Sequence, residues 1–160
     1  MAIEKVRKHF EKYGISKRIQ EFDASSATVE LAAKALHCEP NRIAKTLSFK
    51  LKNENKAILI VVAGDAKIDN RKYKVMFREK AVMLSSNEVV EYIGHAVGGV
   101  CPFGVNDDVE IYLDKSLKRF NIVFPACGSS NSAIGLSIDE LEKYTNYHSW
   151  IDVCKNWYTE

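Results

Sequence analysis

The sequence predicts an α+β fold, in which a mixed, largely antiparallel, barrel-like sheet is flanked by helices. Strand-like runs outnumber amphipathic helical segments, and the two kinds of segment do not alternate strictly along the chain. The 160 residues are enough for one hydrophobic core. No internal repeat, low-complexity stretch or linker divides them, so we expect a single domain over residues 1–160.

The first forty residues predict two helices with a short strand between them. Apolar residues recur at three- and four-residue steps from Ile3 to Tyr13, which is typical of an amphipathic helix, and Gly14 would end it. Residues 17–22 favour a short strand. Thr28 is a suitable N-cap for the second helix, and Pro40 lies just beyond the end of that helix.

A β-hairpin is expected in the next part of the chain. The runs 43–51 and 57–63 are strand-like, and a polar turn joins them. After the hairpin, Asp69 can cap a helix, and residues 80–84 favour another short strand.

Two capping boxes mark the starts of helices in the second half. Ser85 with Glu88 predicts a helix that ends near Gly94, and Ser137 with Glu140 predicts a second helix start. From there the chain is expected to close with one or two helical segments. Between the two boxes, strands are expected at residues 109–113, 121–125 and about 133–136.

The composition excludes several classes of protein. Lys and Arg number 23 against 21 Asp and Glu, and a net charge of +2 does not fit a histone-like polycation. The longest strongly apolar run has eight residues, whereas a membrane helix needs about 20. The four cysteines form no CxxC pair and have no histidine at metal-ligand spacing. We therefore expect no metal site, no disulfide framework and a reducing, cytoplasmic setting.

Lys45 is the most informative single residue. Period-2 alternation along the strand 43–51 places it on one face with four apolar residues, which are Ile43, Leu47, Phe49 and Leu51. An ammonium group is costly to bury unless an anion or a ligand meets it. Lys45 is therefore either a site residue or a lysine whose stem covers apolar surface while its charge reaches water.

A glycine-rich segment is the second candidate feature. Four of the eight glycines of the chain fall within residues 94–104. The pair Gly98-Gly99 permits positive φ and lets a ligand approach the backbone N–H groups closely. Such a loop can stabilise an oxyanion without a reactive side chain, or it can be a tight connector. It matches neither a dinucleotide-binding loop nor a Walker A loop.

Two further groups of residues each allow a functional and a structural interpretation. Residues 127–132 are small, with hydroxyl and amide side chains, and they either line a polar pocket or form a turn. Cys101 could be a nucleophile with His95 as its base. That constellation is weak, because both residues lie in one flexible loop and lone cysteines are usually small buried apolar residues.

A basic stretch lies between the hairpin and the first capping box. Six positive charges fall within residues 67–80, with Tyr73 and Phe77 among them. Arg71, Lys72 and Lys74 are the candidates for contact with a phosphate backbone. The alternative is a solvated helix face.

Taken together, these segments resemble the YbaK/prolyl-tRNA synthetase-associated editing-domain family, and the resemblance covers nearly the whole chain. Each segment alone is a weak signal, and their order and spacing make the match specific. The segments that carry it are Ala27–Ala33, Arg42–Leu47, Val61–Asp65, Gly94–Gly104 and Gly128–Ser132.

This resemblance implies a mixed α/β fold and the hydrolysis of a wrongly attached amino acid from the 3′ end of a tRNA. It implies no cofactor. Cysteine-specific members carry a Gly-Gly-Lys-Arg-like stretch where this chain has Gly128-Ser129-Ser130-Asn131, which leaves Cys and Ala both open as the amino acid removed. By position, the resemblance assigns catalysis to Lys45, Gly98 and Gly99, and substrate binding to Phe22, Thr46, Val100, Gly128, Ser129 and Ser130.

The partner implied by the resemblance is a mischarged tRNA, typically the tRNA for proline, with an aminoacyl-tRNA synthetase as a further partner. Arg71, Lys72 and Lys74 would then contact the body of the tRNA. Neither DNA nor a membrane is expected as a partner. Two alternatives stay open: a non-catalytic module that binds the aminoacyl-adenosine end, and a thiol enzyme that uses Cys101.

Overall fold

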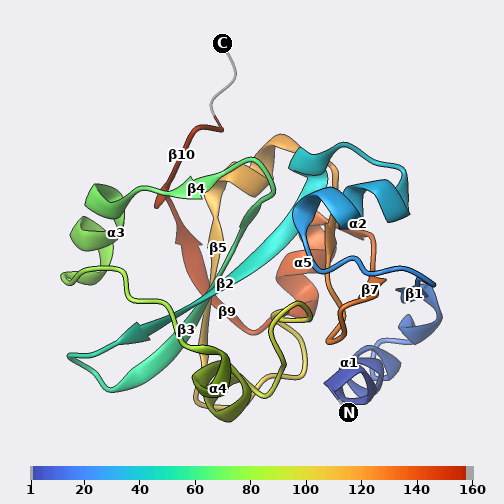
Figure 1. Cartoon of the computed structure of the whole chain (residues 1–160), viewed down its shortest axis with the longest axis horizontal. Coiled ribbons are helices and arrows are strands. Elements are labelled where there is room, and N and C mark those ends of the chain that lie inside the picture. Colours follow the sequence, from blue (N-terminus) through green and yellow to red (C-terminus); the bar gives the residue numbers. More distant parts are fainter. Residues whose placement is uncertain (1, 158–160) are drawn as a thin grey trace.

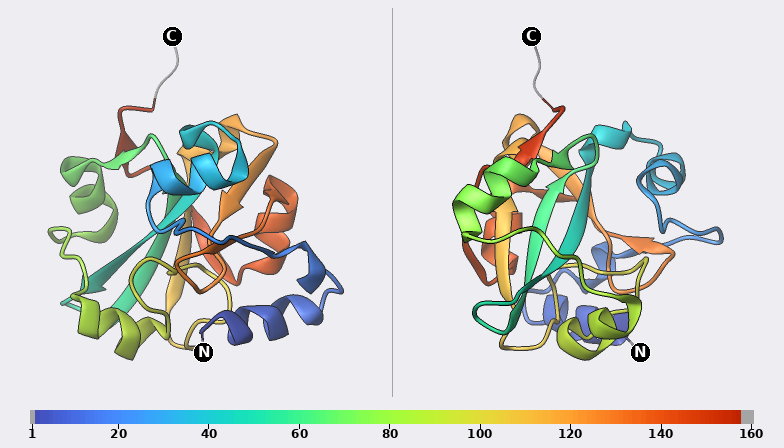
Figure 2. Two further views of the ribbon diagram at one scale, coloured as in Figure 1. Left: turned by 45° about the vertical axis from the view of Figure 1, so that its right-hand side comes forward. Right: turned by 60° about the vertical axis from the view of Figure 1, so that its left-hand side comes forward.

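The computed structural model describes residues 2–157 and is built around one curled six-stranded sheet (Figure 1). The strands are arranged in the order β8-β6-β2-β3-β5-β9. Turned views show that the sheet bends into an open half-barrel rather than lying flat (Figure 2). The bounds of these strands are β2 Ile43–Leu51, β3 Lys56–Ala63, β5 Glu110–Asp114, β6 Ile122–Pro125, β8 Leu136–Ser137 and β9 Tyr147–Ile151.

The pairing of the strands is mixed, as the sequence predicts. In the main sheet, β2–β3 and β6–β8 are antiparallel, whereas β2–β6, β3–β5 and β5–β9 are parallel. Two small antiparallel ladders lie outside it, β1 (Gln20–Glu21) with β7 (Ser132–Ala133) and β4 (Lys67–Ile68) with β10 (Cys154–Lys155). Antiparallel ladders thus outnumber parallel ones by four to three among the described residues.

The helices begin where the capping residues predict. The Thr28 hydroxyl accepts a hydrogen bond from the Leu31 N–H, and Asp69 caps its helix in the same way. Both predicted capping boxes, at Ser85 and Ser137, are present. The helix after Ser85 continues as a π-helical turn, Val89–Ile93, and ends at Gly94 with φ of 95°. The helices are α1 Ala2–Glu11, α2 Val29–Leu36, α3 Asn70–Phe77, α4 Ser86–Glu88 and α5 Ile138–Tyr144.

Four predicted elements differ from the structure. Residues 17–22 form a 3-10 turn, Ser16–Arg18, followed by the two-residue β1. Residues 80–84 form no strand, because Met83 makes only an isolated bridge to Phe49. The expected strand at 133–136 is divided by Gly135 into β7 and β8. The chain closes with one helix, α5, and then with β9 and β10, because the aromatic run after α5 pairs with β5 instead of forming a second helix.

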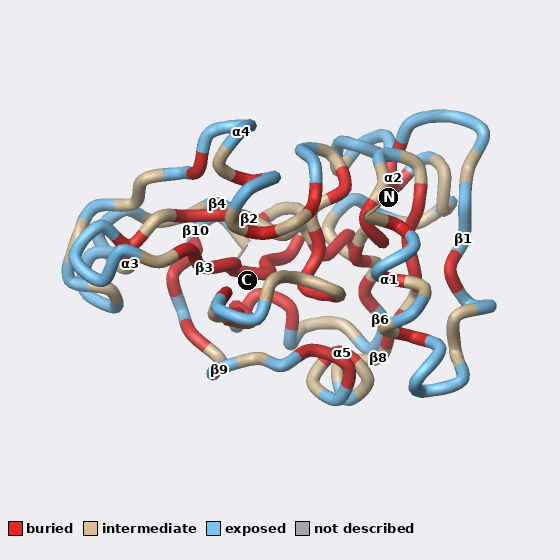
Figure 3. Tube along the Cα trace, turned by 90° about the horizontal axis from the view of Figure 1, so that it is seen from below, coloured by how far each residue is buried: buried red, intermediate tan, exposed pale blue. Residues whose placement is uncertain are grey.

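The core is centred on β3. Residues 58–63 of this strand are completely buried, so the eight-residue apolar run of the sequence is a strand covered on both faces. Figure 3 shows the buried segments gathered in the central strands, with exposed backbone at the outer ends of the molecule. Among the described residues, no helix has the length and apolar character needed to cross a membrane.

Asp114 joins the end of β5 to the C-terminal part of the chain. Its side chain is completely buried and accepts hydrogen bonds from the Ser116 N–H at 3.0 Å and the Val153 N–H at 2.9 Å. The Ser116 hydroxyl in turn accepts a hydrogen bond from the Ala63 N–H at 3.1 Å. These contacts hold the ends of β3 and β5 and the approach to β10 at fixed positions.

We predict that Asp114→Ala lowers the free energy of unfolding by about 3 kcal/mol, because two buried N–H groups lose their acceptor. Urea denaturation measures this change. Asp108→Ala, at an exposed position, is the matched control and should change stability by less than about 0.5 kcal/mol. Equal effects of the two substitutions would contradict the assigned role of Asp114.

Candidate active site

A cavity of about 510 Å³ lies beside β2. One wall is β2 itself, from Ile43 to Ser48. The opposite walls come from four segments that are distant in the sequence: the approach to α2, the segment that leads into α4, the glycine-rich loop, and the segment from the end of β6 to β7. Residues that contribute to these walls include Ser26, Ala27, Thr28, Met83, Leu84, Val97, Gly98, Val100, Ala126 and Ser132.

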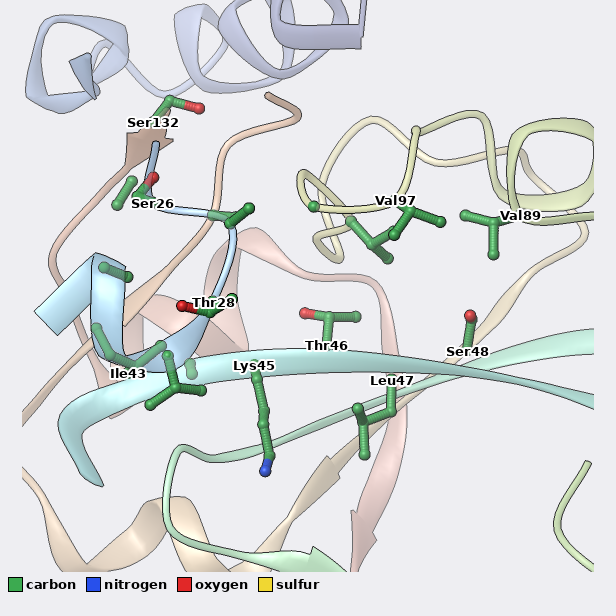
Figure 4. Close-up of a pocket in the computed structure, with 18 of the residues that line it drawn as sticks. Ser26, Thr28, Ile43, Lys45, Thr46, Leu47, Ser48, Val89, Val97 and Ser132 are labelled. Atoms are coloured by element: carbon green, nitrogen blue, oxygen red, sulfur yellow. The ribbon is translucent and has the colours of Figure 1, made fainter. Parts of the chain in front are cut away.

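Successive side chains of β2 point in opposite directions at the cavity. Figure 4 shows the side chains of Thr46 and Ser48 directed toward the side occupied by Val97 and Val89. The side chains of Lys45 and Leu47 extend from the other face of the strand. This arrangement follows from the alternation of a β-strand, and it gives the two faces different chemical character.

Lys45 is half-buried, and its Nζ donates one long hydrogen bond, 3.5 Å, to the carbonyl of Gly64. Burial lowers the pKa of Lys45, and the nearby Cys154 and Asp65 oppose this shift. Asp65 is itself bound by both terminal nitrogens of Arg119, at 2.9 and 2.6 Å. Lys45 is the one charged side chain among the described residues that line the cavity.

Gly98 and Gly99 are required for two different reasons. Gly98 lines the cavity and has φ of 95°, a conformation that favours glycine. Gly99 is buried, and a Cβ built on it would lie 2.6 Å from the Ser129 nitrogen and 2.7 Å from the Gly128 carbonyl carbon. Gly99 therefore packs the glycine-rich loop directly against the backbone of the loop at 128–130.

Hydrogen bonds attach that loop to the segment that precedes α2. The Ser26 N–H donates to the Ser130 carbonyl at 2.6 Å, and the Phe22 N–H donates to the Asn131 carbonyl at 2.8 Å. The Asn131 side chain donates back to the Phe22 carbonyl at 2.9 Å. Ser129 shares a 2.6 Å hydrogen bond with Ser132, which lines the cavity. The 128–132 loop is thus a support for the residues that form the wall.

The residues predicted from the sequence divide into two layers. Lys45, Thr46, Gly98 and Val100 line the cavity. Phe22, Gly99, Gly128, Ser129 and Ser130 lie outside this lining. Sequence reasoning did not identify the hydroxyls of Ser26, Thr28 and Ser48, or the apolar Met83 and Val97. Ser132 belongs to the segment 127–132, for which the sequence allows a polar pocket as one of two interpretations. Thr28 was assigned only a capping role, and its place at the start of α2 beside a serine pair was the available signal.

Cys101 and His95 lie behind this site. The Cys101 Sγ is 3.6 Å from the His95 Nε2, and both side chains contact the Phe103 carbonyl. Neither residue lines the cavity, and Cys101 is completely buried. Burial raises the pKa of the Cys101 thiol to about 12 and lowers the pKa of His95. A neutral, inaccessible thiol does not suit a nucleophile, which argues against the thiol-enzyme alternative.

The basic stretch forms α3 and its flanks. Arg71 and Lys74 are exposed. The Lys72 ammonium donates to Asp152 at 3.0 Å and to the Cys154 carbonyl at 2.9 Å. The three predicted cations therefore differ, because Lys72 holds the C-terminal segment whereas Arg71 and Lys74 extend toward solvent.

Comparison with known proteins relates this architecture to aminoacyl-tRNA editing. Residues 23–144 match the model of the aminoacyl-tRNA editing domain family. The uncharacterized protein YwhH of Bacillus subtilis (strain 168) is 54% identical over 157 residues, which cover 98% of this chain and 99% of YwhH. A proline–tRNA ligase of Bacillus velezensis is 33% identical over 92 residues, or 57% of this chain but 16% of the ligase. This chain thus corresponds to a small part of that relative.

Solved structures share the fold over nearly the full length. A crystal structure described as a candidate trans-editing enzyme for prolyl-tRNA synthetase superposes with a TM-score of 0.85 at 28% identity, over 96% of this chain and 97% of that one. The hypothetical protein APE2540 gives a TM-score of 0.83 at 26% identity, over 94% and 99% of the two chains. Both matches show that these proteins share the overall fold of this chain.

Alanine substitutions at three glycines should distinguish the stability cost of backbone strain from the cost of steric overlap with the added Cβ. Gly14 has φ of 73° and open space around a built Cβ, so Gly14→Ala should cost about 1 kcal/mol of strain alone. Gly98→Ala adds contact with the Ala27 Cβ at 3.3 Å and should cost slightly more. Gly99→Ala meets backbone at 2.6 Å and should cost about 3 kcal/mol.

Thermal and urea denaturation of the three variants measure this order. A Gly99→Ala protein as stable as Gly14→Ala would show that the two loops are not packed together as described.

Proposed function

Because the chain belongs to the aminoacyl-tRNA editing domain family, we propose that it is a hydrolase that cleaves the ester bond of a mischarged aminoacyl-tRNA in the cytoplasm. The observation that carries this proposal is the cavity beside β2. It combines a glycine with positive φ, several small hydroxyl side chains and, among the described lining residues, one partly desolvated lysine. These groups suit the binding of a small ester better than they suit nucleophilic or metal chemistry.

The lining favours a small, uncharged amino acid. Apolar and hydroxyl side chains make up most of the walls, and none of the described lining residues carries a carboxylate. A lysyl or arginyl side chain would therefore find no compensating anion in these walls. Alanine, cysteine and serine fit these conditions, and alanine or cysteine on the tRNA for proline is the substrate we favour.

Positioning can supply the required catalysis. An aminoacyl ester is already an activated acyl group, so fixed N–H donors and correct placement can provide the few kcal/mol needed. In the proposed complex the backbone at Gly98 lies against the ester, and Lys45 exchanges its long contact with Gly64 for the terminal phosphate, the ribose or the ester carbonyl. The nucleophile is water, a tRNA hydroxyl or the substrate side chain.

Two findings support prolyl-tRNA editing in particular. Proline–tRNA ligases recur among the relatives, with matches over 16% to 21% of their lengths. A structural neighbour is described as a candidate trans-editing enzyme for prolyl-tRNA synthetase. The alternative, a module that binds the aminoacyl-adenosine end without cleaving it, predicts the same cavity.

Turnover separates these two functions. The tRNA for proline, charged with Ala, Cys or Ser, is incubated with catalytic amounts of the protein, and release of the amino acid is followed. A hydrolase releases many equivalents of at least one amino acid and spares prolyl-tRNA. Binding of the charged tRNA without release above the spontaneous rate would establish the binding module instead.

We predict that Lys45→Ala lowers the rate of deacylation by about tenfold or more, which corresponds to the removal of one hydrogen bond from a charged donor. Stability should change by about 1 kcal/mol or less, because burial already disfavours the charged form of Lys45. Single-turnover hydrolysis and urea denaturation measure the two effects.

Lys50→Ala is the matched control for this substitution. Lys50 lies on the same strand but outside the cavity, where it faces Glu88 at 3.6 Å. Its removal should leave deacylation within about twofold of the wild-type rate. Comparable activity of the Lys45→Ala protein would remove Lys45 from the mechanism.

A separate prediction concerns α3. Arg71→Gln and Lys74→Gln should weaken binding of the tRNA and flatten its salt dependence by about one log–log unit for each phosphate that is no longer neutralised. Cleavage of a minimal aminoacyl-adenosine should stay unchanged. Lys72→Gln should instead lower stability, since it breaks the hydrogen bonds to Asp152 and the Cys154 carbonyl. Fluorescence titration at several salt concentrations tests this, and an unchanged slope for Arg71→Gln with Lys74→Gln would identify a merely solvated helix face.

A further inference from the structure

The outer edge of β2 is the one that faces away from β3. On this edge, the backbone of Thr46 has no strand partner among the described residues. The Leu84 N–H donates to the Ser48 carbonyl at 3.2 Å, and the Lys50 N–H donates to the Val82 carbonyl at 2.8 Å. Backbone groups of a strand alternate between its two edges, so the N–H and C=O of Thr46 face the same outer edge as those of Ser48. Within residues 2–157, no backbone partner reaches this edge at Thr46.

On either side of Thr46, the outer edge of β2 does have backbone partners. Ala44 is in register with Pro125, the last residue of β6. After Pro125 the chain turns away, and Ala126 bridges to Ala133 instead. The gap between these partners opens into the cavity, since Ala44, Thr46, Ser48, Leu84 and Ala126 all line it.

The side chain of Thr46 is also unsatisfied. Its Oγ1 is buried and has no hydrogen-bond partner within the described part of the chain. Figure 4 shows the Thr46 side chain on the cavity side of β2, with its oxygen turned toward Thr28. Buried polar groups nearly always have partners in native proteins. Three polar groups of one residue, the hydroxyl, the N–H and the C=O, are therefore available to a ligand at this point.

We propose that the aminoacyl group of the substrate fills the empty position of the β2 edge, an inference that rests on the proposed function. An aminoacyl ester carries a nitrogen and a carbonyl on either side of one Cα, as does each residue of an antiparallel ladder. Its α-amino group donates to the Thr46 carbonyl, and its ester carbonyl accepts from the Thr46 N–H.

This pairing has consequences for selectivity and for rate. Directly opposed residues in a ladder place their side chains on the same face of the sheet. The substrate side chain therefore enters the cavity on the side of the Thr46 hydroxyl, where Ser48 and Val97 lie. The Thr46 N–H polarises the ester carbonyl and stabilises the charge that develops on its oxygen. Every substrate of this site must therefore carry a free α-amino group, whichever amino-acid side chain it has.

Substrates without the amino group test the proposal. Alanyl and propionyl esters of adenosine differ only by this group, and each enzymatic rate is divided by the spontaneous rate of the same ester, because the amino group also activates the ester. We expect the normalised acceleration to be roughly tenfold to hundredfold lower for the propionyl ester, as for the loss of one hydrogen bond to a charged group. Equal normalised acceleration for the two esters would overturn the proposal.

The Thr46→Val variant distinguishes recognition by the Thr46 backbone from recognition by the Thr46 hydroxyl. It keeps the backbone groups and the shape of the side chain but removes Oγ1. Both esters should be cleaved more slowly by a similar factor, so the preference for alanyl over propionyl is retained, and Thr46→Ser should recover the rate. Loss of the preference in Thr46→Val would assign recognition of the amino group to the hydroxyl and overturn recognition by the edge.

Amide exchange gives a readout that does not depend on catalysis. A non-hydrolysable 3′-alanylamido-adenosine is added at saturation, and exchange is followed at single residues by NMR. The Thr46 amide should exchange at least about tenfold more slowly in the complex, whereas the Lys45 amide, which faces β3, should not change. Protection of Thr46 without any ester cleavage would refute the hydrolase and retain edge recognition. Cleavage without protection of Thr46 would do the reverse.

Discussion

The whole site depends on a change of hydrogen-bonding partner along one strand. The inner edge of β2, the one that faces β3, is paired with that strand from Ala44 to Leu51, and this pair is held in the centre of the core. Its outer edge is paired first with β6 and then with the segment at 82–84. The chain leaves β2 after Pro125, because Ala126 bridges to Ala133 and the Pro125 carbonyl accepts from the Ile134 N–H instead. The space between the two partners becomes the cavity.

Everything around that space is fixed by loops that support one another. Gly99 packs on the backbone of the 128–130 loop, and the carbonyls of Ser130 and Asn131 hold the segment from Phe22 to Ser26. Gly128 also has positive φ and packs against α1, where a built Cβ would lie 2.9 Å from the Ala2 carbonyl oxygen. Among the described residues, no group of three or more His, Cys, Asp or Glu side chains could hold a metal ion here. Close backbone contact between small residues gives the walls their rigidity, and any added methyl group would disturb it.

Local signals in the sequence were sufficient for most elements. The caps at Thr28, Asp69, Ser85 and Ser137 and the hairpin of β2 and β3 depend on residues close in the chain, and all were predicted. The strands β9 and β10 were not predicted, because both form only by long-range pairing, β9 with β5 and β10 with β4. The candidate site shows the same division. Thr46 and Gly98 lie in recognisable local patterns, whereas the contributions of Ser48 and Met83 to the cavity follow from the long-range arrangement of the sheet.

The chemistry available in the cavity also explains why a strand edge is a suitable site. Cys101 and His95, the groups that could act as nucleophile and base, are directed into the core, and the cavity itself contains one cation and several hydroxyls. A site of this kind accelerates hydrolysis only as far as it orients the ester, since the geometry replaces a strong base. Two backbone hydrogen bonds to Thr46 fix the ester plane more strictly than a flexible lysine can, because the strand is already ordered by β3. Selectivity then follows from fit, because an amino acid too large for the cavity cannot reach the position at which its ester meets the strand.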